Sequence, residues 1–290
     1  MSARDDQGMI LVNVLMFVAI ATGLVLLMIT REEVALDRSL RVREAARAMA
    51  AVRGGELSAL VALRRDAATA PEVDSAAEPW ATLSESGAPI EGGSFDLAIA
   101  DAEGRFNVNL LRSGNAAATI LFQEVARAAG LDEDQTVKAI EAVRLAGPFT
   151  DLRPLRAAGF APEVLAKLQG MVTALPGETG ININAATPEV LLILFRDPVV
   201  VERLMAVRAR NGALTMTDLA DQNVSLPLGA SFRSNTFWVR TRATIGDTVQ
   251  QGATLIQRRQ ADGVTEVWPV ERWLNAAVPP DAPPFAVPAA

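Results

Sequence analysis

The distribution of apolar residues is most uneven at the start of the chain. From Met9 to Thr30 the sequence reads MILVNVLMFVAIATGLVLLMIT, a run of twenty-two residues without a charge. Because an α-helix rises about 1.5 Å per residue, such a run crosses a hydrocarbon layer roughly 30 Å thick. A secretory signal peptide has a shorter apolar core, about 7–15 residues, followed by a small-residue cleavage site that is missing here. The run therefore predicts a membrane-spanning helix, and a plain signal anchor has the same pattern.

After Thr30 the pattern changes to apolar positions at helical spacing with Arg and Glu between them. The apolar or small positions are Val34, Leu40, Ala45, Met49, Val52, Leu57, Leu60 and Val61. We expect one helix over residues 9–65 that is apolar all round at first and amphipathic afterwards. Gly54 and Gly55 are its expected weak point, since each glycine costs about 1 kcal/mol relative to alanine.

The next part of the chain predicts a connection and a hairpin. Residues 66–94 are rich in Ala, Pro, Ser, Gly and acids, which is typical of a long connection. FDLAIADAEGRFNVNLL then alternates between apolar and polar positions and is interrupted by DAEG. This pattern predicts a strand at 95–100, a turn at 101–104 and a second strand at 105–109.

Two helical blocks follow. Residues 115–173 have helical periodicity, and Asp132 with Gln135 forms an expected N-cap pair. Thr187 begins the second block, which runs to about residue 220, because Pro188 follows it at the first helical position. Four glycines stand where helix C-caps are expected: Gly130, Gly147, Gly159 and Gly170.

The end of the chain returns to strand patterns. Residues 237–245, 253–260 and 265–273 contain alternating β-branched and aromatic residues, separated by Gly-Asp and Asp-Gly turns. Residues 274–290 are rich in Ala and Pro and predict a loose tail.

A short sequence pattern occurs twice, once before each helical block. Asn107 and Asn109 in RFNVNLL are matched by Asn182 and Asn184 in GININAA, and GPFTDL downstream of the first pair is matched by GALTMTDL downstream of the second. Side chains two apart in an extended segment point to the same side. We interpret these asparagines as structural, because their amides satisfy loop backbone where a strand leads into a helix; an interface or an ion site is the functional alternative.

Composition restricts the chemistry. The 290 residues include no cysteine, histidine or tyrosine, which removes disulfides, thiolate zinc sites, imidazole ligands and Ser-His or Cys-His dyads. Carboxylates, serines, Lys138 and Lys167 remain, and no grouping of them indicates an active site. A carboxylate enzyme built on Asp132, Glu133 and Asp134 is a weak alternative, since we interpret that cluster as a solvated helix start. We therefore expect a protein that is not an enzyme.

A net charge of −7 argues against a nucleic-acid partner, because phosphate affinity is built from excess Lys and Arg. One local pattern points the other way. ININAATPEVLLIL and VRARNGALTMTDL resemble the helix-hairpin-helix proteins of DNA binding and DNA uptake. Where that family has a glycine hairpin whose N–H groups face phosphate, this chain has FRDPVVVERL. A signal-anchored DNA-binding protein of the uptake type is therefore the rival hypothesis.

The first residues resemble the type IV prepilins and the pseudopilins of type II secretion, in which a short leader ending in Gly precedes an uncharged helix. The resemblance implies that a prepilin peptidase cuts after Gly8 and that the new N-terminus, Met9, is methylated. Most members have a glutamate at the fifth mature position, which pairs with a neighbouring subunit's N-terminal amine. This chain has Asn13 there, which supplies no charge. Minor pseudopilin K is the member known to lack the glutamate.

Over almost its full length the chain resembles the type II secretion protein K family, the large minor pseudopilins. The shared features, in order, are the glycine leader, the missing glutamate, FNVN, PFTDL, ININAATPEVL, RNGALTMTDL and a closing sheet with FWVR and QRR. The family usually has NTA where this chain has Asn184, Ala185 and Ala186. The resemblance implies an α+β pseudopilin fold: a long N-terminal transmembrane and amphipathic helix packed on a small antiparallel sheet, with an inserted all-helical domain.

These patterns together divide the chain into six parts. They are a prepilin-type leader (1–8), the N-terminal helix (9–65), a connection with the first strands (66–110), an inserted all-helical domain (111–178), a second helical block with the closing antiparallel strands (179–273) and a Pro/Ala-rich tail (274–290).

The resemblance implies a minor pseudopilin at the tip of the type II secretion pseudopilus, which starts filament assembly with minor pseudopilins I and J. It also implies an inner-membrane anchor and a periplasmic bulk. Charge alone predicts the opposite orientation, because Arg4 precedes the span while Arg31, Arg38 and further arginines follow it. Some family members bind calcium, and an oxygen-only calcium site fits this composition. The carboxylates of Asp218 and Asp221 are candidates, but EF-hand spacing is missing and we assign no ligand.

Overall fold

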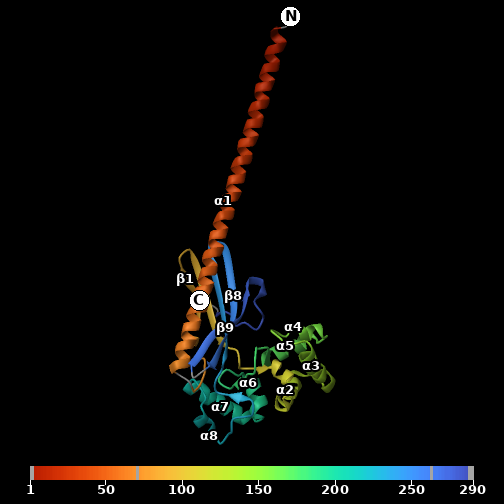
Figure 1. Ribbon diagram of the computed structural model, residues 1–290, viewed down its shortest axis with the longest axis vertical. Coiled ribbons are helices and arrows are strands. Elements are labelled where there is room, and N and C mark those ends of the chain that lie inside the picture. Colours follow the sequence, from red (N-terminus) through yellow and green to blue (C-terminus); the bar gives the residue numbers. More distant parts are fainter. Residues whose placement is uncertain (1–2, 70–71, 262–263, 287–290) are drawn as a thin grey trace.

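The computed structural model describes residues 3–69, 72–261 and 264–286, and for residues 3–11, 260, 261 and 264 the backbone alone. Its most prominent element is α1 (Ala3–Thr69), a single helix that passes through Gly54 and Gly55 without a break. The first half of α1 projects away from the rest of the protein, and the second half lies along a sheet (Figure 1). The expected long helix is therefore present, and its two glycines do not interrupt it.

One antiparallel sheet forms the centre of the protein, with the strand order β1-β2-β7-β8-β9. Its strands are β1 (Glu85–Ile90), β2 (Gly93–Asp101), β7 (Thr236–Ile245), β8 (Thr248–Ala261) and β9 (Val264–Leu274). The neighbours β2 and β7 pair with Ala100 opposite Trp238, although more than a hundred residues separate them in sequence. Within the described residues, all the α-helices after α1 are inserted in this crossover.

Side chains alternate between the two faces of the sheet. One face packs on α1: Leu97, Ile99, Phe237, Val239, Ile256 and Val267 form a core with Ala59, Leu60, Leu63 and Trp80. Trp80 meets Phe237 edge-on, with the ring centroids 5.1 Å apart. Burial of this face fixes the register of the strands, because a slip of one residue would turn every apolar side chain to the other face.

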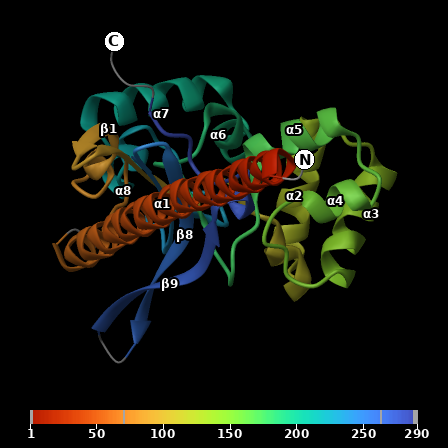
Figure 2. The same cartoon turned by 90° about the horizontal axis from the view of Figure 1, so that it is seen from above.

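The inserted helices form two groups (Figure 2). The first contains α2 (Ala116–Ala129), α3 (Glu133–Leu145), α4 (Arg153–Ala157) and α5 (Pro162–Met171), preceded by the 3-10 helix η2 (Val108–Ser113). The second contains α6 (Pro188–Phe195), α7 (Pro198–Asn211) and α8 (Met216–Asp221). One continuous apolar core joins both groups, and both lie at the end of the protein far from the free half of α1 (Figure 1).

Local capping signals set the helix ends. Asp132 and Gln135 form a reciprocal capping box at the start of α3, and Thr187 caps α6 with Pro188 at its first position. Gly130 adopts the left-handed conformation at the end of α2, with a φ of 87°. Gly170 is different from the expectation: it lies inside α5, which continues to Met171.

Three other expectations were wrong. The predicted hairpin of 95–100 with 105–109 does not form, because β2 pairs with β1 and β7, while β3 (Phe106–Asn107) pairs in parallel with β4 (Val172–Thr173). The expected connection 66–94 contains the 3-10 helix η1 (Ala81–Leu83), β1 and the start of β2.

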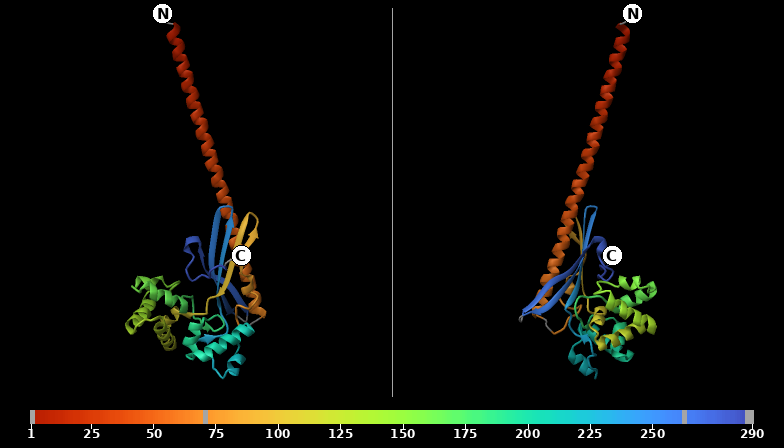
Figure 3. Two further views of the ribbon diagram at one scale, coloured as in Figure 1. Left: turned by 180° about the vertical axis from the view of Figure 1, so that it is seen from behind. Right: turned by 45° about the vertical axis from the view of Figure 1, so that its right-hand side comes forward.

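The predicted loose tail, residues 274–290, is the third for the part that the structure describes, and residues 287–290 lie outside it. After η3 (Asn275–Ala277), residues 278–286 lie against the face of the sheet opposite α1 (Figure 3), where Ala282 is 5% exposed. Proline lacks a backbone N–H, so a proline-rich segment pairs poorly as a strand, but its rings still pack on apolar side chains.

Candidate functional site

The free half of α1 is the first candidate site. Described side chains from Val12 to Val42 are exposed, and they include large apolar residues such as Phe17, which is 67% exposed. Within the described residues this is the one helix long and apolar enough to cross a membrane, with a mean hydropathy of 2.6 in its best window and none of that window buried. Burial of this surface in lipid or against other helices removes it from water.

The residues of the predicted processing site lie at the start of this helix. Asn13 is exposed on α1, among apolar neighbours. Gly8 and Met9 are part of the helical backbone, and Met9 belongs to the stretch whose side chains lie outside the described residues. Cleavage after Gly8 and methylation of Met9 therefore stay predictions.

The second half of α1 has two different faces. Its inner face packs on the sheet through Val52, Leu60 and other apolar residues, as the periodicity predicted for those positions. Leu57 and Val61, one helical turn apart, are 61% and 56% exposed on the other side. The predicted apolar stripe is therefore divided: part of it forms the core, and part remains available for another helix.

Gly55 allows the close approach of α1 to the sheet. A Cβ at Gly55 would lie 2.6 Å from Cζ of Phe95 and 2.8 Å from Cγ2 of Thr241, whereas a Cβ at Gly54 would meet nothing within 4 Å. Polar contacts fix the same packing: Arg272 Nη2 donates to Glu56 Oε1 at 2.7 Å, and Thr254 Oγ1 donates to Glu56 Oε2 at 2.8 Å.

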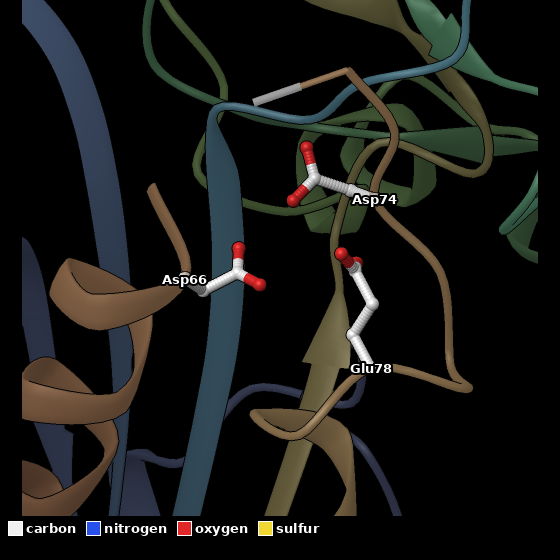
Figure 4. Close-up of side chains that lie close together, drawn as sticks. All are labelled: Asp66, Asp74 and Glu78. Carbon is white, nitrogen blue, oxygen red and sulfur yellow. The ribbon is translucent and has the colours of Figure 1, made fainter. Parts of the chain in front are cut away.

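A buried ionic junction joins the end of α1 to the sheet, and Figure 4 shows its acidic members. Arg258 on β8 contacts Asp66 through Nη2 and Asp74 through Nη1, each at 2.8 Å, and all three side chains are at most 4% exposed. The Arg258 guanidinium also lies over the Phe237 ring, 4.4 Å from its centroid. Burial raises the pKa of Asp66 to about 6, although Arg258 beside it acts in the opposite direction.

Glu78 completes the group in Figure 4, in which carboxylate oxygens of Asp66, Asp74 and Glu78 lie within 4.8 Å of one another. Glu78 accepts hydrogen bonds from the Ser75 N–H at 2.7 Å and from Trp80 Nε1 at 3.1 Å. Because Arg258 already lies between the two aspartates, this group is an internal ion-pair cluster that fastens the end of α1 to the sheet and to the connection that follows.

Sequence reasoning missed this junction. The signal was present in ATLIQRRQ, where Arg258 has the same strand parity as the inward-facing Ile256. A charge on the buried face of a strand needs a partner, but the sequence does not say that the partners are Asp66 and Asp74.

A second buried polar network surrounds Asn182. Its Nδ2 donates to the Asp101 carboxylate at 2.7 Å, to the Asp74 carbonyl at 2.9 Å and to Ser234 Oγ at 3.0 Å. Burial raises the pKa of Asp101 to about 6 and that of the neighbouring Glu103 to about 8. Glu103 is 1% exposed, so its neutral form is favoured near neutral pH.

The two N-x-N pairs have matching geometry. The side-chain amide of the second asparagine in each pair donates to the backbone carbonyl of one residue and accepts from the backbone N–H of the same residue. Asn109 makes these two bonds with Phe149, at 2.9 and 2.8 Å, and Asn184 makes them with Leu214, at 3.1 and 2.6 Å. Phe149 and Leu214 occupy equivalent places in GPF and GAL, so the repeated sequence pattern has a structural counterpart. The first asparagine of each pair ends a short strand: Asn107 ends β3, and Asn182 ends β5 (Ile181–Asn182), which pairs in parallel with β6 (Ala230–Ser231).

The remaining candidate acids lie at helix termini. Asp218 is the third residue of α8 and forms a capping box with Thr215, whose hydrogen bonds hold the pKa of Asp218 below its usual value. Asp221 is exposed at the end of α8, and Asp132 with its two acidic neighbours begins α3 at the surface. The structure does not bring Asp218 or Asp221 together with the acids of the buried junction.

These features define the class of protein: a long apolar N-terminal helix, packed by its second half on an antiparallel sheet with helices inserted between two strands, is the pseudopilin fold. No protein-family model matches the chain. In sequence it is similar to type II secretion system protein K of Pseudomonas aeruginosa, at 26% identity over 88% of this chain and 90% of the relative. In structure it is similar to a chain in the crystal structure of the GspK–GspI–GspJ complex from the type 2 secretion system of enterotoxigenic Escherichia coli. That match has a TM-score of 0.63 and 18% identity, and it covers 82% of this chain and 99% of the other. The predicted resemblance to the type II secretion protein K family is confirmed.

Proposed function

We propose that the chain is a minor pseudopilin of type II secretion that lies at the tip of the pseudopilus and starts its assembly. The observation that carries the proposal is the placement of two features at opposite ends of one protein. At one end α1 is exposed and apolar, and at the other both helical groups extend beyond the sheet (Figure 1).

The exposed half of α1 is suited to two environments. In a membrane it is an anchor, and in a filament its apolar surface packs on the same segment of other subunits. Leu57 and Val61 extend the apolar surface along the part of α1 that stands beside the sheet. Minor pseudopilins I and J are the proposed partners, because the structural relative belongs to a GspK–GspI–GspJ complex.

The helical groups support a position at the tip. They lie at the end of the protein away from the free half of α1 (Figure 1), and they would obstruct a further subunit placed beyond that end. Asn13 fits the same position, because a subunit with nothing above it has no N-terminal amine to pair with a carboxylate there.

Processing and orientation complete the proposal. A prepilin peptidase removes residues 1–8, Met9 becomes the methylated N-terminus, and the bulk lies in the periplasm. The arginines after the span oppose this orientation when charge is considered alone, but long translocated domains override that bias.

The geometry between α6 and α7 argues against the alternative hypothesis of a DNA-binding protein, because the N–H groups that would contact phosphate are already paired. Between α6 and α7, Asp197 accepts hydrogen bonds from the N–H groups of Val199 at 2.8 Å and Val200 at 3.3 Å. These are N–H groups at the start of α7, where an anion would bind. A carboxylate already occupies this position and repels phosphate.

Site-directed crosslinking tests the proposed assembly surface, and the cysteine-free sequence makes it direct. A Leu57→Cys variant carrying benzophenone maleimide is expressed with minor pseudopilins I and J and irradiated in membranes. The matched control is Leu145→Cys on α3, where the native side chain is 86% exposed. We expect a crosslink to a minor pseudopilin from position 57 and none from position 145. Equal labelling of both cysteines without a crosslink from position 57 would contradict the proposal.

A further inference from the structure

The face of the sheet opposite α1 is covered by the chain's own residues 278–286, here called the strap (Figure 3). The strap reads VPPDAPPFA and contains four prolines. It begins with a turn in which the Ala282 N–H donates to the Pro279 carbonyl at 3.2 Å. Residues 283–286 then continue without joining a strand.

The sheet supplies an apolar surface for the strap. Trp238 and Trp273 lie side by side with ring centroids 5.3 Å apart, and Leu255 and Ala253 continue the surface. Ala282 packs into this cluster. Aromatic surfaces of this kind bind proline-containing extended segments, because such segments lose little conformational entropy on binding.

Two arginines hold the far end of the strap. The guanidinium carbons of Arg240 and Arg242 each lie 4.6 Å from the centroid of the Phe285 ring. Arg240 Nη1 also donates to the Pro283 carbonyl at 3.1 Å, and Ser86 Oγ donates to the Ala286 carbonyl at 2.6 Å. Arg242 is paired with Asp96 at 2.8 Å, whereas the hydrogen bonds of Arg240 within the described residues go to neutral oxygens of Pro283 and Gln251.

Nothing in these contacts requires the strap to be covalently continuous with the sheet. It is joined to β9 through the exposed residues 275–277. Ring stacking, apolar contacts and hydrogen bonds to its carbonyl groups hold it on the sheet. A cavity of about 370 Å³ remains between the strap, Trp238 and Arg105. The surface is therefore formed by the sheet itself, and the strap does not fill it completely.

We infer that this face is a binding groove for an extended, proline-rich segment with one aromatic residue, and that the strap is a tethered ligand occupying it. The same kind of segment on another polypeptide takes the strap's place when the strap is released. The tether gives the strap an effective concentration in the millimolar range, so the groove is closed to weak competitors while the strap is attached. This inference does not depend on the role in secretion.

The test uses the full chain folded in detergent, with a site-specific protease sequence inserted between Ala276 and Ala277. After folding, the strap is cut from the sheet and removed by dilution and gel filtration, and circular dichroism checks that the sheet persists. Binding of a fluorescein-labelled VPPDAPPFA peptide is then measured by anisotropy. We expect saturable binding to the cut chain and none to the uncut chain.

Matched variants make the test specific. Phe285→Ala in the peptide and Arg240→Gln in the chain should each weaken binding at least about tenfold, because the first removes both ring–guanidinium contacts and the second removes one of them. Arg203→Gln on the exposed side of α7 is the control and should leave binding unchanged. The inference fails if the cut, folded chain does not bind peptide up to about 1 mM, the concentration that a short tether provides. It also fails if a scrambled peptide binds equally well.

Discussion

The buried junction makes a strong prediction about Arg258→Met. Methionine keeps much of the apolar contact with Phe237 but removes the charge that lies between Asp66 and Asp74. Both aspartates are then buried without a counter-ion, at 4% and 0% side-chain exposure. Removing one partner of a buried ion pair costs about 3–5 kcal/mol, since the remaining charge is not compensated. We expect a loss of stability in that range at pH 8.

The pH dependence gives the prediction a second signature. The pKa of Asp66 is already raised to about 6 in the folded protein, and loss of Arg258 removes a charge that lowers it. The folded variant then holds protons at Asp66 that the unfolded chain has lost, so the variant's stability falls as the pH rises through this higher pKa. At pH 5 protonation relieves part of the penalty. The difference between variant and parent is therefore smaller at pH 5 than at pH 8.

The assay is guanidinium unfolding of the full chain in detergent, followed by tryptophan fluorescence. Trp80 is 2% exposed and packs on Phe237, so it reports on the core beside the junction. The matched control is Arg259→Met on the same strand. Arg259 is 65% exposed and lies 3.6 Å from Glu266, and surface pairs of this kind contribute about 0–1 kcal/mol. Equal effects of the two substitutions, or a difference from the parent that does not change with pH, would refute the reasoning.

Three further predictions concern other positions. Gly54→Ala should stabilise α1 by about 0.5–1 kcal/mol through helix propensity. Gly55→Ala should instead destabilise the protein by about 1–3 kcal/mol, because its Cβ overlaps Phe95. Thermal unfolding of the two variants in parallel checks the direction of each change in stability. Asn184→Ala should lower the free energy of unfolding by about 2–4 kcal/mol, because it leaves buried backbone groups without hydrogen-bond partners. Asn184→Asp keeps the side-chain volume, so denaturant unfolding of both variants separates the loss of hydrogen bonds from the loss of volume. Glu103→Gln should remove a pH dependence: with a folded pKa of about 8, the parent loses stability as the pH rises from about 4.5 to 8. The variant should then be more stable than the parent by a few kcal/mol at pH 9 and nearly equal at pH 5, and equal pH profiles would contradict this.

Elements determined by local pattern were predictable from the sequence. The uncharged run and the helical spacing after it gave α1, and the alternating strands near the end gave β7, β8 and β9. Capping residues such as Asp132 and Thr187 marked helix starts because their side chains bond within three residues of themselves. In each of these cases the interaction that decides the structure is close in sequence.

Elements determined by distant partners were not predictable. The β2 strand was predicted to pair with residues 105–109, but its neighbours are β1 and β7, and β7 lies beyond all the inserted α-helices. The β1 strand, ESGAPI, has no apolar alternation and contains Gly87 at a φ of 63°, so it is a strand only because β2 pairs with it. The strap was predicted to be part of a loose tail, since its proline-rich composition gives no sign of the aromatic surface on which it packs.

The candidate site follows the same division. The exposed apolar helix could be read from the sequence, because membrane and filament surfaces depend on one continuous segment. The Asp66–Arg258–Asp74 junction could not, since its members come from α1, a connection and β8. The repeated N-x-N pattern lies between these cases: both copies were visible, but their bonds to Phe149 and Leu214 required the fold.

The proposal that the chain is a pseudopilin is tested most directly at its N-terminus. The measurement is mass spectrometry of the intact protein purified from membranes that contain an active prepilin peptidase, with a peptidase-deficient strain as the control. The proposal predicts a mature chain that begins at a methylated Met9 in the first sample and an unprocessed leader in the second. An intact leader in the presence of the peptidase, or cleavage at any position other than after Gly8, would contradict it.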